Sequence, residues 1–121
     1  MRIGIVGSRR RATGKDRAIV SDIVLCAPSG AVIVSGGCPT GADAFAEMAA
    51  AQYGHEMVVH LPEPVSAGSP RWEWTKAFHA RNKTVAEDVD VLYALVSNDR
   101  TGGTESTIGF AEKAGTLIKL I

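Results

Sequence analysis

The chain has 121 residues, 45% of them hydrophobic, and 13 basic side chains balance 13 acidic ones to a formal net charge of zero. This length and composition predict one globular domain, residues 1–121, with a core of its own. Zero net charge argues against a general binder of nucleic acid or anionic membranes, and no apolar run is long enough to span a bilayer. Two cysteines are too few for a disulfide scaffold. The charged segment follows the first apolar run, the reverse of a secretory signal, so we expect a cytoplasmic protein.

Apolar runs alternate with helical periodicities along the chain. Strands are predicted at 2–6, 31–35, 56–61, 89–96 and 116–121, and helices at 15–27, 41–53, 72–88 and 104–114. The strands are apolar almost throughout, which suits parallel strands that are covered on both faces. The sequence therefore predicts an α/β fold, a single Rossmann-like or flavodoxin-like doubly wound sheet of about five mainly parallel strands with helices on both faces. The strand orders 2-1-3-4-5 and 3-2-1-4-5 both stay open.

Residues 62–72, PEPVSAGSPRW, interrupt this regular pattern. Three prolines, one glycine and two serines exclude a helix or strand there. A loop this long in a small domain is either functional or a surface crossover, and its composition does not choose between them. In the helix that follows, one stripe is formed by Trp74, Ala77, Phe78, Arg81 and Val85. Arg81 in an apolar face needs a partner, either an acidic side chain or a ligand phosphate.

Three distinctive loops follow the first, second and fourth strands: GSRRR, SGGCPTGAD and SNDRTGGTES. Loops at the carboxyl ends of parallel strands surround the ligand crevice of a doubly wound sheet, so these three can converge on one ligand. Glycines let backbone N–H groups turn inward, and a helix that starts after them presents further N–H groups at its positive end. Thr40 can cap the second helix, and Asp43 stands three residues later, where a carboxylate bonds back to the turn. The loops therefore predict a phosphate-bearing ligand.

Other motifs of nucleotide and metal chemistry are absent. Gly7 and Gly14 are separated by six residues rather than the four of a P-loop, and Asp16 stands where Ser or Thr would hold magnesium. No G-x-G-x-x-G occurs, and the three histidines lack metal-ligand spacing with either cysteine. Cys38 lies near a helix start, but no histidine is evidently placed as its base. We predict no metal, no cofactor and no cysteine nucleophile.

The motifs GSR, SGG…GAD, ARN and GGT, in this order, resemble the SLOG superfamily of Rossmann-like nucleotide-binding proteins, and most of all its small YspA-like members. The resemblance extends from Ile3 to Gly115. The segment from ARN into the next strand also resembles DprA, the DNA-processing member. The superfamily includes the LOG phosphoribohydrolases, which cleave the base from a nucleoside 5′-monophosphate.

The resemblance implies a binding site drawn from all three loops, with a SLOG-like nucleotide-binding domain over residues 1–121. It favours ligand contact for Arg81, either directly or by ordering the glycine loop, and it makes residues 102–104 a second phosphate loop. The predicted ligand-binding residues are Gly7, Ser8, Arg9, Ser35, Gly36, Gly37, Thr40, Gly41, Ala42, Asp43, Arg81, Asn82, Thr101, Gly102, Gly103 and Thr104.

The resemblance also puts a threonine where LOG enzymes have their catalytic glutamate. Their motif is P-G-G-x-G-T-x-x-E, and aligning Thr104 with its threonine puts Thr107 at the glutamate position. Glu105 falls two positions earlier, roughly 200° away around a helix of about 3.6 residues per turn. We therefore predict a protein that binds a nucleotide or nucleotide-derived molecule, as a sensor or sequestering module. The alternative is a phosphoribohydrolase that uses Arg81 with Glu105 or Asp43 as its carboxylate.

A third function and an assembly state also follow from the resemblance. A DprA-like binder of single-stranded DNA would use the run Arg9–Arg11 with Trp72 and Trp74, although such a run is more typical of a solvated turn. SLOG relatives commonly pair, so the resemblance implies a homodimer with one of these tryptophans at its interface.

Overall fold

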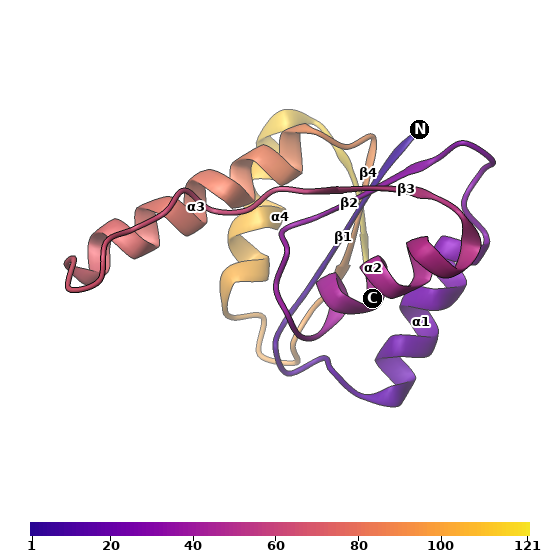
Figure 1. Cartoon of the computed structure of the whole chain (residues 1–121), viewed down its shortest axis with the longest axis horizontal. Coiled ribbons are helices and arrows are strands. Elements are labelled where there is room, and N and C mark those ends of the chain that lie inside the picture. The colour runs from indigo at the N-terminus through magenta and orange to yellow at the C-terminus, as the bar shows by residue number, and fades with distance from the viewer.

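The computed structural model describes residues 1–121 and contains nine elements in strict alternation (Figure 1). They are β1 Arg2–Gly7, α1 Gly14–Leu25, β2 Val32–Ser35, α2 Ala42–Tyr53, β3 Glu56–Val59, α3 Arg71–Glu87, β4 Val91–Leu95, α4 Gly103–Ala114 and β5 Leu117–Leu120. Every predicted strand and helix is present, with its ends within two residues of the prediction. The predicted α/β class is confirmed.

The sheet is parallel throughout and has the order β3-β2-β1-β4-β5. Of the two orders that the sequence left open, this is the Rossmann-like one. At the carboxyl edge Gly7 of β1 pairs with Leu95 of β4. Because β2 lies on the other side of β1, the three distinctive loops leave from three adjacent strands.

Two helices cover each face of the sheet (Figure 1). On one face, Val20 and Val24 of α1 and the alanines of α2 pack against Ile5 of β1. On the other face, Val85 of α3 and Ile108 of α4 pack in a second cluster with strands β1, β2 and β4. The outer strands β3 and β5 are covered less fully than predicted, and none of their residues is buried.

The start of α1 is fixed by a capping box that the sequence analysis did not identify. The hydroxyl of Thr13 accepts from the backbone N–H of Asp16, whose carboxylate accepts from the N–H of Thr13. Arg11 donates to Asp16 at 2.8 Å and to the carbonyls of Val96 and Ile121. Burial alone would raise the pKa of Asp16, but the hydrogen bonds from Arg11 and Thr13 hold it below its usual value. Arg11 is therefore part of the scaffold, and the expectation of a solvated turn is wrong for it.

The first half of α3 and the segment before it extend away from the sheet (Figure 1). We call residues 62–78 the arm. Of the predicted irregular segment 62–72, residues 62–70 form no helix or strand, whereas its last two residues already belong to α3. Along α3 the first buried side chain is Ala77, whereas Trp72 is 62% exposed and Trp74 39%. No helix in the chain is both long and apolar enough to cross a membrane.

Two glycine substitutions test this packing in opposite directions. A methyl group on Gly7 would lie 2.7 Å from Cβ of Ala42, where α2 begins against the end of β1. Gly7→Ala should therefore lower the free energy of unfolding by about 1–3 kcal/mol through overpacking.

Gly109, inside α4, has open space at its Cβ position. Gly109→Ala should raise the free energy of unfolding by about 0.5–1 kcal/mol, because alanine loses less backbone entropy on folding.

Urea unfolding of the two variants and the parent protein measures both changes. If Gly7→Ala were as stable as the parent protein, α2 would not approach the end of β1 as closely as the structure shows.

Candidate functional site

Three loops at the carboxyl edge of the sheet and one side of α3 enclose a cleft of about 440 Å³, a size typical of small-molecule sites. Eleven of the sixteen predicted ligand-binding residues line it: Gly7, Ser8, Arg9, Gly36, Asp43, Arg81, Asn82, Thr101, Gly102, Gly103 and Thr104. The other five do not: Ser35, Gly37, Thr40, Gly41 and Ala42. These five belong to the end of β2, the turn after it and the start of α2. The three loops thus converge as predicted.

Helices α2 and α4 begin with the same unusual backbone conformation. The residue before α2, Gly41, has φ 72° and ψ −149°, and the residue before α4, Gly102, has φ 103° and ψ −173°. This region of backbone space is accessible essentially to glycine alone. No side chain caps either helix, so the first N–H groups have no side-chain acceptor from a capping residue. The predicted cap by Thr40 is wrong, because Gly41 is the capping residue and the Thr40 hydroxyl lies 3.9 Å from Sγ of Cys38.

At the α2 end of the cleft, Asp43 is bonded to its own turn, as the sequence predicts. Its Oδ2 accepts from the backbone N–H of Cys38 at 3.0 Å, and the residue is 8% exposed. Burial raises the pKa of Asp43 above its ordinary value, although the hydrogen bond from Cys38 and the nearby Arg81 both lower it. Asp43 is the one carboxylate among the residues that line the cleft.

Arg81 finds a partner that neither of the predicted alternatives included. Its Nη1 donates to the backbone carbonyl of Gly36, and its Nε donates to Oδ1 of Asn82 at 3.0 Å. Asn82 in turn donates to the carbonyl of Gly103 at 3.4 Å. A methyl group on Gly36 would lie 2.8 Å from Arg81 Nη1, so the close approach requires glycine. Arg81 and Asn82 therefore connect the loop after β2 with the start of α4.

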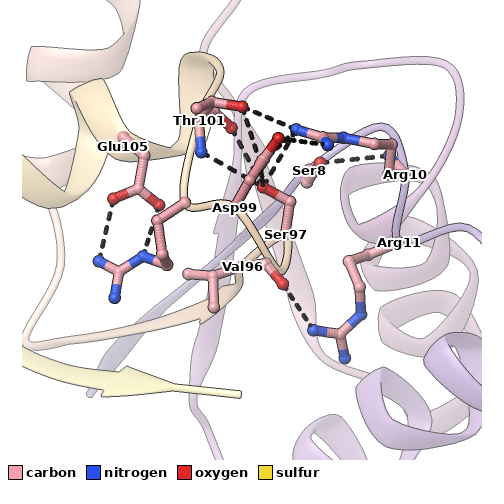
Figure 2. A network of polar contacts seen from close by, with 9 residues as sticks. Ser8, Arg10, Arg11, Val96, Ser97, Asp99, Thr101 and Glu105 are labelled. Atoms are coloured by element: carbon pink, nitrogen blue, oxygen red, sulfur yellow. Dashed lines mark hydrogen bonds and ion pairs between the residues drawn. The ribbon is translucent and has the colours of Figure 1, made fainter.

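A second arginine connects the loops after β1 and β4 (Figure 2). Arg10 donates to both carboxylate oxygens of Asp99, at 2.8 and 2.7 Å, and to the hydroxyl of Thr101 at 2.8 Å. Hydrogen bonds from Arg10, and then from Thr101 and Ser97, hold the pKa of Asp99 far below its usual range. Arg10 is exposed and lies in a turn, as the expectation of a solvated turn requires, but its guanidinium is held by Asp99 and Thr101. Arg9, which is exposed and lines the cleft, has no hydrogen-bond or ion-pair partner in the chain.

The buried side of α4 presents two hydroxyl groups to the cleft. Thr104 and Thr107 lie one turn apart, are 7% and 2% exposed, and line the cleft. Neither hydroxyl has a hydrogen-bond partner in the chain. Thr107, Arg10 and Phe78 line the cleft but were not predicted as binding residues. Helical spacing could have identified two of them from the sequence. Thr107 follows Thr104 by three residues, and Phe78 precedes Arg81 by three, so each pair shares one side of its helix.

Glu105, a candidate catalytic carboxylate, does not line the cleft. Its two carboxylate oxygens accept from Nε and Nη2 of Arg100, both at 2.9 Å. Figure 2 shows Glu105 away from Arg10 and its network. This agrees with the angle around α4 that separates Glu105 from Thr107.

Comparisons with known proteins identify the fold. No family model matches the sequence, and no curated protein is detectably similar to it. Among solved structures, DNA processing protein A (DprA) from Streptococcus pneumoniae is similar with a TM-score of 0.78 and 21% identity, over 98% of this chain and 49% of that one. The chain thus spans about half the length of that DprA chain.

Two further structures concern the molybdenum cofactor. The carrier protein MCP from Chlamydomonas reinhardtii has a TM-score of 0.73 and 19% identity, over 98% of this chain and 74% of that one. The molybdenum cofactor binding protein from Rippkaea orientalis has a TM-score of 0.71 and 22% identity, with the same coverage. At such identities the likeness is one of fold. The chain has a Rossmann-like fold, which it shares with DprA and the molybdenum cofactor carrier protein.

Proposed function

We propose that the chain binds a nucleotide or nucleotide-derived small molecule in this cleft, as a sensor or sequestering module. The observation that carries the proposal is the glycine-only helix start at Gly102, where Gly102, Gly103 and Thr104 all line the cleft and no side chain caps α4. The positive end of a helix with free N–H groups favours an anion. Arg9 adds a positive charge that no group of the chain neutralises.

The likeness to the cofactor carriers supports the proposal. Two of the similar structures are named as a carrier and a binding protein of the molybdenum cofactor. Proteins with the same fold are thus named for carrying or binding a cofactor. Such a role suits a cleft whose lining includes a single carboxylate.

The alternative functions have less support in the geometry. A LOG-type phosphoribohydrolase uses a glutamate at the bond that is cleaved, but Thr107 stands at that position and Glu105 lies outside the cleft. A binder of single-stranded DNA needs a free basic groove. Arg10 and Arg11 are instead committed to Asp99 and Asp16.

The glycine-only conformation at Gly102 provides the direct test of binding. Gly102→Ala should weaken binding of a nucleoside 5′-monophosphate at least about tenfold, because a Cβ forces the helix start out of its conformation. Gly115→Ala, at the other end of α4, is the matched control. Gly115 has φ 74° in the left-handed region, so alanine there should cost about 1–2 kcal/mol of stability and leave binding unchanged. Calorimetric titration with the adenosine, guanosine, cytidine and uridine monophosphates measures the affinities. If both variants bound the monophosphates with equal affinity, the start of α4 would not be part of the binding site.

We expect binding without efficient cleavage of the base. Thr107 stands where a LOG enzyme has its glutamate, and a threonine cannot stabilise a cationic sugar by charge. Chromatography of each monophosphate after incubation with the protein should show no free base above the level of a protein-free control. Base release at an ordinary enzymatic rate that is abolished by Asp43→Asn would identify Asp43 as a catalytic residue and contradict the proposal.

We also propose that the arm pairs with the arm of a second copy. In the first half of α3 Ala77 is the one buried side chain, and so short a helix is marginal in water unless something covers it. Trp74 and Phe78 are exposed aromatic side chains that lie one turn apart on this helix. In an antiparallel pair of arms, Trp74 of one copy lies beside Phe78 of the other. The charged residues of the arm are Glu63, Arg71, Glu73 and Lys76, two of each sign. Balanced charges suit a second copy better than a polyanion.

Trp74→Glu should convert a dimer to a monomer, because it puts a charge into the apolar centre of the paired arms. Met48→Glu is the control, since Met48 is exposed to a similar extent, 49%, but lies on α2. Light scattering after size-exclusion chromatography measures the mass. A parent protein that is monomeric at high micromolar concentration would contradict the pairing.

A further inference from the structure

The two ends of the cleft differ in charge. At the α4 end the helix start is uncapped, and Thr104 and Thr107 are buried with hydroxyls that have no partner in the chain. The acidic residue of the first turn, Glu105, is neutralised by Arg100 and lies outside the cleft. A phosphate here meets free N–H groups and hydroxyl donors with no like charge beside it.

The α2 end has the same backbone conformation but not the same chemistry. Asp43 already occupies the positive end of α2, where its carboxylate accepts from the N–H of Cys38. The nearest guanidinium, that of Arg81, is committed to the carbonyl of Gly36 and to Asn82. A phosphate placed here would face a buried carboxylate of its own sign. A sugar hydroxyl would instead find an acceptor, because an ionised carboxylate has several lone pairs and one hydrogen bond uses only one of them.

Building on the proposed function, we propose that Asp43 is the specificity-determining residue of the cleft. The ligand lies with its phosphate at the start of α4 and its sugar hydroxyls at Asp43. The ligand class is then a nucleoside with a 5′-phosphate and free 2′ and 3′ hydroxyls. Nucleotides that carry a second phosphate on the far side of the sugar are excluded by charge repulsion.

A set of three probes for each base tests this orientation by calorimetry. The probes are the nucleoside 5′-monophosphate, its 2′,3′-dideoxy form and the nucleoside 3′,5′-bisphosphate, in adenine, guanine, cytosine and uracil series. The parent protein should bind the 5′-monophosphate at least about tenfold more tightly than either of the others. In Asp43→Asn the penalty for the bisphosphate should fall below about threefold, because the repelling charge is gone while the shape is kept.

The control is Glu47→Gln, which removes a charge from the next turn of the same helix. Glu47 is exposed and does not line the cleft, so both affinity ratios should stay as in the parent protein. Inorganic phosphate gives a readout that does not need a nucleotide. Its stabilisation of the protein against heat should be lost in Thr107→Val and kept in Asp43→Asn.

The outcomes separate the orientation from the proposed function. If nucleotides bind but Asp43→Asn changes all three affinities by the same factor, Asp43 does not orient the ligand, and only this inference is overturned. Tighter binding of the bisphosphate than of the 5′-monophosphate by the parent protein would overturn it too. If no probe binds in any series, the proposed function itself fails.

Discussion

Both helices at the cleft start from a backbone conformation that essentially only glycine adopts. At Gly41 and Gly102 the absent Cβ lets the chain turn from the end of a strand directly into a helix without a capping side chain. The start of α4 is therefore open towards the cleft, whereas the carboxylate of Asp43 occupies the start of α2. The position of these starts depends on the sheet, whose order puts the loops after β1, β2 and β4 side by side.

Flexible glycine loops need external restraints, and arginines supply them. Arg81 ties Gly36 to the third helix, Arg10 ties the first loop to Asp99, and Arg11 ties the start of α1 to Val96. Each of these cations holds two segments that are distant in sequence, so the cleft is organised before any ligand arrives, which lowers the entropy cost of binding. Arg9, which lines the cleft, has no partner in the chain, so its charge is available to a ligand.

Local patterns predicted the elements and the loops, because strand and helix periodicities and glycine runs are visible in a single sequence. They also predicted that the three loops converge, since parallel strands bring their carboxyl ends to one edge. Hydrogen-bond partners that are distant in the sequence could not be predicted in this way, because no local pattern indicates them. The partner of Arg81 is a backbone carbonyl 45 residues away, and the partner of Arg10 is 89 residues away. The angle around α4 did separate Thr107 from Glu105, although only the structure shows that Glu105 is bound by Arg100.

The central claim is that the cleft binds a phosphorylated nucleoside. A titration of the ¹⁵N-labelled protein with each nucleoside and its 5′-monophosphate, followed by amide NMR spectra, tests it residue by residue. The account predicts that the monophosphate, but not the nucleoside at the same concentration, shifts the amides of Gly102, Gly103 and Thr104 strongly. Amides in the arm or on α1 should stay in place. Shifts of equal size with nucleoside and nucleotide, or shifts confined to residues outside the cleft, would contradict it.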